Sequence, residues 1–165
     1  MKIIKGDLIE MALNGKFNVI AHGCNCYCTQ KAGIAKSMDI HFNTSKYKLE
    51  SLQYKGDYNK LGQIESLSRN NELWSTDGKL MSYHSLDIIN AYTQYRYGKN
   101  KDGSSPIDYD ALRMCMKKIN HIYRGKTVGV PWIGCGLAGG NEEIVKLIFE
   151  ETCKDINLIV VEYDK

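Results

Sequence analysis

A strand, a loop of small and polar residues and a helix start follow one another between Val19 and Met38, and this stretch constrains the fold most. Phe17 to Ala21 is apolar on both faces, which predicts a central strand of a sheet. Ala32 to Ala35 has the composition of a first helical turn, and we expect the helix to run from Gly33 to Phe42. Unpaired backbone N–H groups and the dipole at a helix start favour an anion such as phosphate.

A second loop of the same form runs from Gly134 to Gly140, after a strand expected over Thr127–Pro131 and before a helix capped by Asn141. Glycine lets the backbone come close to phosphate oxygens, so two such loops on one sheet edge could hold a diphosphate. The alternative is that each loop is only a tight β–α connection. The glycines of this loop match the GxGxxG spacing, but no acidic ribose-binding residue follows them.

Strands and helices alternate along the rest of the chain, with a hairpin-like region in the middle. This order predicts an α/β protein: one domain, residues 1–165, built as a three-layer α/β/α sandwich around a mixed sheet. We also expect helical turns over Tyr47–Tyr54, a turn at Asn70-Asn71, a hairpin turn at Asp77-Gly78, a strand over Leu86–Gln94, and a helix capped by Asp108 with Ile122 on its inner face.

Composition excludes several classes of protein. The chain has 165 residues, 43% of them hydrophobic and 25% charged, as in folded soluble proteins. No apolar run reaches the roughly 18 residues of a membrane span, and the start lacks a secretory signal. Six cysteines without such a signal indicate free thiols in a reducing cytosol. The net charge of +3 is too small to indicate nucleic-acid binding. We therefore expect a cytoplasmic monomer without membrane or direct nucleic-acid contacts.

His22, Cys24, Cys26 and Cys28 occupy every second position after the first strand. A zinc site is one interpretation, but structural zinc sites normally separate their cysteines by two residues or more. We favour small, half-buried packing for the cysteines and expect no metal. His22 could act as a general acid or base beside the first loop, or it could be a structural histidine. Asp7 could cap a short helix or accept a hydrogen bond from a ligand amino group.

Four segments together resemble the macro-domain family: KGDL, VIAHGCNCYCTQKAGIA, INAYTQYRYG with the following DYDAL, and VPWIGCGLAGG. They cover nearly the whole chain in the family's order. The resemblance implies a mixed sheet between helices and a cleft for ADP-ribose. It is closest to the branch that contains the ADP-ribose-1″-phosphate phosphatases and the ADP-ribosyl-glutamate hydrolases.

The resemblance also implies roles for individual residues. Asp7, beside Leu8, corresponds to the aspartate that contacts the adenine amino group, and Asn25 lies near the distal ribose. His22 matches a histidine thought to be catalytic in a similar HxCNC segment of the fungal-type phosphatase. The residues matching the loops around the diphosphate and distal ribose are Ala32, Gly33, Ile34, Ala35, Gly134, Cys135, Gly136, Leu137, Ala138 and Gly139.

Two departures from the family pattern bear on catalysis. The hydrolase branch has a lysine shortly after GIA and an aspartate directly after GCGL, where this chain has Asp39 and Ala138. The leading hypothesis is therefore an ADP-ribose-binding phosphatase acting on ADP-ribose 1″-phosphate, with His22 as the catalytic group and no cofactor. The alternatives are a non-catalytic ADP-ribose reader and an ADP-ribosyl hydrolase that works without the lysine.

Overall fold

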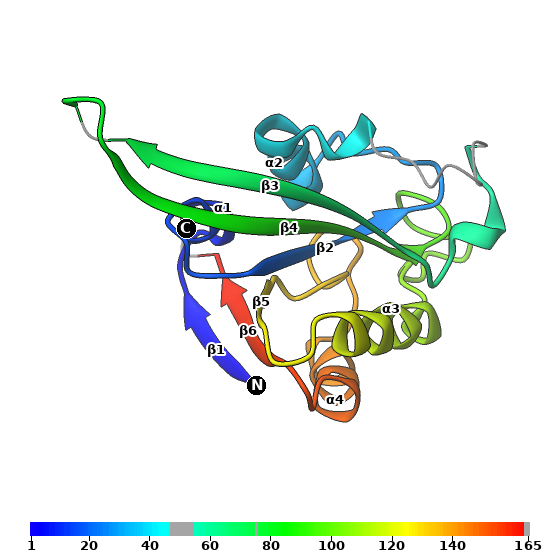
Figure 1. Cartoon of the computed structure of the whole chain (residues 1–165). Coiled ribbons are helices and arrows are strands. Elements are labelled where there is room, and N and C mark those ends of the chain that lie inside the picture. Colours follow the sequence, from blue (N-terminus) through cyan, green and yellow to red (C-terminus); the bar gives the residue numbers. More distant parts are fainter. Residues whose placement is uncertain (47–54, 75, 164–165) are drawn as a thin grey trace.

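The structure is a computed structural model that describes residues 1–46, 55–74 and 76–163 (Figure 1). It contains a six-stranded sheet in the order β1-β6-β5-β2-β4-β3. Neighbouring strands are parallel except β3, which is the antiparallel edge strand beside β4. The strands are β1 (Lys2–Lys5), β2 (Val19–Asn25), β3 (Ile64–Trp74), β4 (Leu80–Gln94), β5 (Thr127–Val130) and β6 (Asn157–Glu162).

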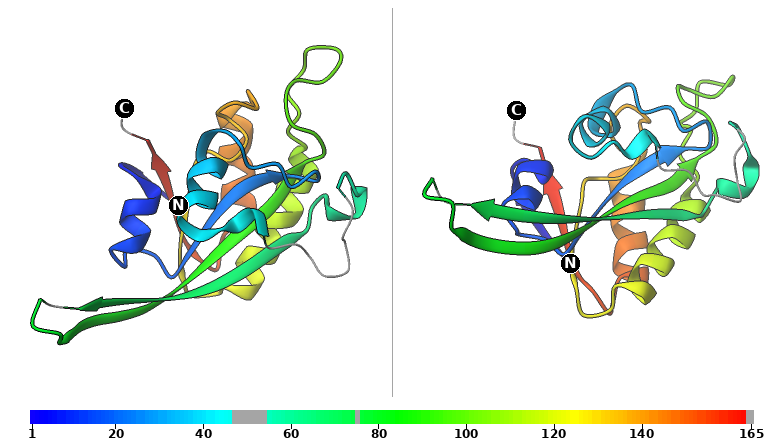
Figure 2. Two further views of the ribbon diagram at one scale, coloured as in Figure 1. Left: turned by 90° about the horizontal axis from the view of Figure 1, so that it is seen from above. Right: turned by 45° about the horizontal axis from the view of Figure 1, so that its top comes forward.

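Helices cover both faces of this mixed sheet (Figure 2). The helices α1 and α2 pack on one face, and α3 and α4 pack on the other. The predicted three-layer α/β/α sandwich is thereby confirmed. The helices are α1 (Leu8–Leu13), α2 (Gly33–Phe42), α3 (Tyr109–Ile122) and α4 (Glu142–Thr152), with the short 3-10 helices η1 (Thr44–Lys46) and η2 (Tyr58–Lys60).

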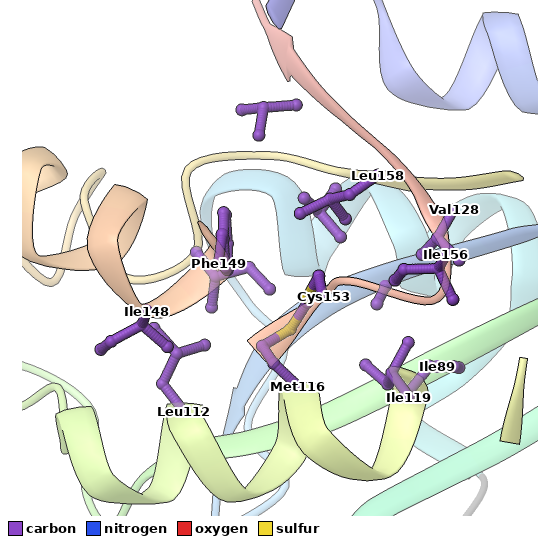
Figure 3. Packing of buried hydrophobic residues seen from close by; sticks show 14 of the residues in the cluster. Ile89, Leu112, Met116, Ile119, Val128, Ile148, Phe149, Cys153, Ile156 and Leu158 are labelled. Carbon is purple, nitrogen blue, oxygen red and sulfur yellow. The ribbon is translucent and has the colours of Figure 1, made fainter. Parts of the chain in front are cut away.

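Successive side chains of β2 point alternately into the two layers of the core. Val19 and Ala21 face the side of α3 and α4, where they meet a cluster that includes Leu112, Met116 and Phe149 (Figure 3). Ile20 faces the other side and joins the cluster with α1 and α2. Because successive side chains of a strand point to opposite faces, a strand apolar at consecutive positions belongs in the middle of the sheet. The predicted central position of this strand is confirmed.

Three helices begin with a side-chain cap, as predicted. Asp7 Oδ1 accepts hydrogen bonds from the backbone N–H groups of Ile9 and Glu10, at 2.8 and 2.9 Å. Asp108 caps α3 and Asn141 caps α4 in the same way. Helix α2 differs, because its N-cap residue is Ala32, which makes no side-chain capping bond. Its first N–H groups therefore lack the partners that the other helix starts have.

Several sequence-based boundaries were wrong. The second strand begins at Val19 and continues to Asn25, so the polar residues after Ala21 are strand residues rather than loop residues. The chain does not turn at Asn70-Asn71, since β3 is continuous there and pairs with β4. The hairpin turn at Asp77-Gly78 is confirmed, with Gly78 at φ +79°. The helix predicted over Tyr47–Tyr54 lies outside the described residues.

One helix face also differs from the prediction. Ile122 of α3 is 59% exposed rather than inward-facing. In α2 the buried residues are Met38 and Phe42, whereas Ile34 and Ile40 lie towards solvent. Only two positions of α2 need to be apolar, because this helix rests on polar as well as apolar groups of the sheet below it.

The hairpin of β3 and β4 extends beyond the rest of the sheet (Figure 1). β4 pairs with β2 only from Asp87 to Gln94. Its first part, from Leu80 to Leu86, is paired with β3 alone among the described strands. The hairpin thus has an inner part within the sheet and an outer, two-stranded part.

Candidate functional site

The two small-residue loops meet at the edge of the sheet where the parallel strands end. One loop connects β2 to α2, and the other connects β5 to α4. They contact each other, because a Cβ added to Gly33 would lie 3.3 Å from Leu137 Cδ1. In an open α/β sheet, this edge is where ligands bind. The prediction that both loops lie on one edge is therefore confirmed.

The first loop offers the uncapped start of α2. Gly33 has φ +56°, a left-handed conformation that glycine adopts at little cost. The backbone N–H groups of Gly33, Ile34 and Ala35 have no acceptor among the described residues. Together with the helix dipole, these donors make the first loop suited to an anion.

The second loop offers a further row of donors. The backbone N–H groups of Gly136, Leu137 and Ala138 also lack an acceptor within the described parts of the chain. Gly136 is exposed, and a Cβ there would meet no atom within 4 Å, so the space beside it is open. The loop is held in shape by Gly140 N–H, which donates to Gly134 O at 2.8 Å. Ser105 Oγ donates to Ala138 O at 2.5 Å and ties the loop to the segment after β4.

Asp7 and Leu8 lie at the end of β1. The capping bonds of Asp7 use Oδ1, and Oδ2 has no partner among the described residues. A half-buried carboxylate oxygen is therefore available to a donor such as an amino group. Leu8 is 4% exposed and its side chain belongs to the core with α1. Of this predicted pair, only Asp7 presents a side-chain group that a ligand could contact.

Trp132 and Glu162 stand between Asp7 and the second loop, and sequence reasoning assigned neither of them a role. Trp132 Nε1 donates to Glu162 Oε1 at 3.0 Å, and the indole lies parallel to the ring of Phe149, with the centroids 6.2 Å apart. Gly6 N–H donates to Glu162 O at 2.9 Å, which joins this pair to the end of β1. The signal available in the sequence was the position of Trp132, between a strand and a glycine-rich loop.

Asn25 is placed at the end of β2 and organises the turn that follows. Its Nδ2 donates to Thr29 O at 2.9 Å, and its Oδ1 accepts from the N–H groups of Tyr27 and Thr29, at 3.1 and 3.2 Å. The side chain is 5% exposed. Asn25 therefore fixes the course of the chain from the strand into the first loop.

His22 lies in the middle of β2 rather than at a strand end, and its ring is fully buried. Its Nε2 is 2.7 Å from Asn90 Oδ1 on β4. Asn90 Nδ2 donates to Thr44 O and to Glu65 Oε2, so Asn90 Oδ1 is left as the acceptor and His22 Nε2 is the donor. Burial lowers the pKa of His22 to about 4, although the bond to Asn90 opposes this shift. The ring is therefore neutral at pH 7.

A buried polar layer surrounds His22 on the face covered by α2. Tyr92 Oη donates to Glu65 Oε2 at 2.9 Å, beside the bond from Asn90 to the same oxygen. Gln30 connects this layer to the first loop, because it accepts from Thr44 Oγ1 at 2.5 Å and donates to Cys24 Sγ at 3.6 Å. We name the set of His22, Cys24, Gln30, Thr44, Glu65, Asn90 and Tyr92 the polar layer.

Asp39 has a structural contact within the same region. Its Oδ1 accepts from Ser45 N–H at 2.8 Å and so joins α2 to η1. The carboxylate is half-buried on the helix. In the described conformation Asp39 therefore acts as a cap for the chain after α2.

The cysteines are free, and most are buried. Burial raises the pKa of the Cys24 thiol well above its usual range and that of Cys26 to about 11, so both are neutral thiols at pH 7. No group of three His, Cys, Asp or Glu side chains among the described residues could hold a metal ion. The alternating His22–Cys28 pattern reflects strand packing up to Asn25 and a turn after it.

A bacteriophage protein is related to this chain along almost its whole length. The 17.5 kDa protein of the tk–vs intergenic region of Enterobacteria phage T4 is 30% identical over 169 residues, which cover 99% of this chain and 97% of the phage protein. This chain belongs to the family of that phage protein. No model of an established protein family matches the sequence.

Solved structures share the fold. A protein from Bacteroides thetaiotaomicron has a TM-score of 0.69 and 25% identity, with 98% of each chain covered. The macrodomain of Thermus aquaticus DarG has a TM-score of 0.65 and 14% identity over 99% of this chain and 97% of its own. Thermosipho africanus DarTG, solved in complex with ADP-ribose, has a TM-score of 0.67 and 15% identity, and the match covers 99% of this chain and 41% of that chain. This chain therefore has the macrodomain fold.

The helices of the described residues are all too short or too polar to cross a membrane.

Proposed function

We propose that this protein binds ADP-ribose at the edge where the two loops meet. The observation that carries the proposal is the pair of facing loops, each with three consecutive backbone N–H groups that lack an acceptor among the described residues. Two rows of donors suit the two phosphates of a diphosphate, which needs hydrogen bonds on both sides when it leaves water. The macrodomain fold and the ADP-ribose complex of Thermosipho africanus DarTG support this ligand.

The ends of the ligand would contact different residues. Asp7 Oδ2 would accept from the adenine amino group, and Trp132 would form an apolar wall beside it. The distal ribose would lie near the turn organised by Asn25, between Ala32–Ala35 and the second loop from Gly134 to Gly139. Gly136 would allow close approach, because no atom occupies the space in front of it.

Calorimetric titration with ADP-ribose tests this proposal, and we expect saturable binding. Gly136→Val should abolish it, because the added side chain would occupy the open space without distorting the backbone. Asp7→Asn keeps a capping residue but removes the charged acceptor, so affinity should fall by about tenfold. Both variants should unfold at the wild-type temperature. Absence of ADP-ribose binding by the wild-type protein, or full affinity in Gly136→Val, would refute the proposal.

The finer proposal is hydrolysis of the phosphate of ADP-ribose 1″-phosphate at the same edge. A neutral His22 could take up a proton at pH 7, as a general base must. Its ring is, however, fully buried, with Cys24 Sγ 3.8 Å from Nδ1 and Asn90 at Nε2. This burial favours the alternative in which the protein binds ADP-ribose without turnover.

An assay of phosphate release from ADP-ribose 1″-phosphate separates these two possibilities. Release that is lost in His22→Gln, with ADP-ribose affinity retained, would support the phosphatase. Equal phosphate release by the wild-type protein and by His22→Gln would show that His22 is not catalytic. Binding with no release supports the reader, and release of ADP-ribose from a modified protein or nucleic acid would instead support a hydrolase that acts without the family's lysine.

A further inference from the structure

Four tyrosines form an aromatic cluster at the ends of β2 and β4, beside the candidate site but outside it. Tyr58 and Tyr95 are stacked, with ring centroids 3.8 Å apart and planes 13° from parallel. Tyr27 packs edge-on against Tyr95 at 5.5 Å and against Tyr97 at 6.3 Å. We name these four residues the tyrosine platform. The ligand contacts proposed above use none of them.

The tyrosine platform is held in place by backbone contacts. Tyr95 Oη donates to Gly56 O at 2.7 Å, and Gly56 N–H donates to Cys26 O at 2.9 Å. Tyr27 lies directly over Gly56, where a Cβ would approach its ring to 2.8 Å. The residues Tyr58 and Tyr97 nevertheless remain 65% and 63% exposed. The platform is thus fixed before any partner arrives, which lowers the entropy cost of binding to it.

Basic side chains occur in the same two segments as these rings, residues 55–58 and 95–102. The guanidinium carbon of Arg96 is 5.7 Å from the centroid of Tyr95. The exposed lysines of the same two segments are Lys55, Lys99 and Lys101. Asp57 caps η2 and Asp102 accepts from Ser104, and both carboxylates keep their negative charge. The surface therefore combines flat aromatic faces with a net positive charge, because these segments carry four basic side chains against two carboxylates.

We propose that the tyrosine platform binds single-stranded nucleic acid. Bases would stack on Tyr58 and Tyr97, while Arg96 and the lysines would contact the phosphates between them. A single strand fits better than a duplex, because the bases of a duplex are already stacked on one another. A small net charge argued against nucleic acid for the chain as a whole, but these two segments carry four basic side chains against two carboxylates.

The platform lies at the same sheet edge as the two loops. The segment after β4 carries Tyr95 to Tyr97 and ends at Ser105, which is bonded to Ala138 of the second loop. A strand bound to the platform would therefore pass close to the ADP-ribose cleft. The proposal does not depend on ADP-ribose binding, because the platform and the cleft are built from different residues.

Fluorescence anisotropy with a labelled oligothymidylate of about 12 nucleotides tests the proposal at about 50 mM salt. We expect saturable binding that Tyr58→Ala and Tyr97→Ala each weaken by about tenfold, with affinity restored in Tyr58→Phe. Tyr163→Ala is the control, because Tyr163 is 71% exposed but follows β6, away from the platform. Arg96→Ala should make the slope of log K against log salt shallower by about 0.7.

Three results would overturn the proposal. They are the absence of saturable binding, an equal loss of affinity in Tyr163→Ala, and a loss of oligonucleotide binding in Gly136→Val. The last result would place the oligonucleotide in the ADP-ribose cleft instead of on the platform. Retained oligonucleotide binding by Gly136→Val, in a protein that has lost ADP-ribose binding, would support two separate sites.

Discussion

On the face of the sheet covered by α3 and α4, β2 contributes Val19 and Ala21, whereas on the face covered by α2 it contributes His22 and Cys24. The first face is filled by aliphatic and aromatic side chains, including Phe149 (Figure 3). The second carries the polar layer, in which Asn90 bonds to His22, Thr44 and Glu65 from three other segments. The apolar face supplies stability through burial, while the polar layer fixes the position of the chain that leads into the first loop.

The largest effect should come from the apolar face. Phe149 is fully buried on α4, so Phe149→Ala should lower the free energy of unfolding by about 3–5 kcal/mol through lost burial and a residual cavity. Leu147→Ala is the matched control on the same helix, because Leu147 is 65% exposed, and its effect should stay within about 0.5 kcal/mol. Urea unfolding measures both. Similar losses in the two variants would contradict this description of the α4 face.

The polar layer should make stability depend on pH. The pKa of His22 is about 4 in the folded protein, below its ordinary value of 6.5, so the unfolded chain binds more protons between these two values. Stability should therefore be complete above pH 6.5 and should fall by roughly 3 kcal/mol as the pH drops to 4.

Urea unfolding at several pH values tests this dependence. His22→Gln should flatten the pH profile between 6.5 and 4. Replacement of the exposed His41 on α2 by Gln should keep the wild-type profile. A wild-type slope that persists in His22→Gln would assign the effect to other groups.

Removing the central amide of the polar layer should have a smaller effect. Asn90→Leu leaves His22 Nε2 and Thr44 O without their partner, which should cost about 1–3 kcal/mol in chemical denaturation. The double variant with His22→Leu should recover part of this loss, because neither side chain of the pair is then left unsatisfied. Additive losses in the double-mutant cycle would show that the two residues are not coupled.

The smallest effect concerns the start of α2. Ala32 has the extended conformation of an N-cap, at φ −148° and ψ 162°, but lacks a capping side chain. Ala32→Asp should raise the free energy of unfolding by about 1 kcal/mol and weaken ADP-ribose binding, because the carboxylate occupies the N–H groups and repels phosphate. Thermal unfolding and calorimetry measure the two changes. A variant that gains stability without losing affinity would show that ADP-ribose does not bind at the start of α2.

Local patterns predicted the elements that depend on local interactions. The caps at Asp7, Asp108 and Asn141 follow from residue type and position, and the two loops follow from their glycines. The alternation of strands and helices was sufficient for the three-layer fold. These features involve residues close together in the chain, which is why sequence patterns reveal them.

The polar layer could not be predicted in this way. His22 and Asn90 are 68 positions apart, and Asn90 and Thr44 are 46 apart, so no local pattern links them. Without these partners, a histidine after Ala21 suggested a loop, although the strand continues to Asn25. The turn predicted at Asn70-Asn71 was wrong for a related reason, because pairing with β4 outweighs the local preference of asparagine for turns.

The long β3–β4 hairpin has a consequence for hydrogen exchange. Its inner rungs adjoin β2 through Asp87–Gln94, whereas its outer rungs, as far as Trp74 opposite Leu80, form backbone pairs only with each other among the described strands. Amide protons should therefore exchange progressively faster from Ile64 towards Trp74, since a two-stranded ribbon in water opens more easily than a central strand. A time course of deuterium uptake along this single hairpin would thus record local opening free energies, from values close to global unfolding at one end to near zero at the other.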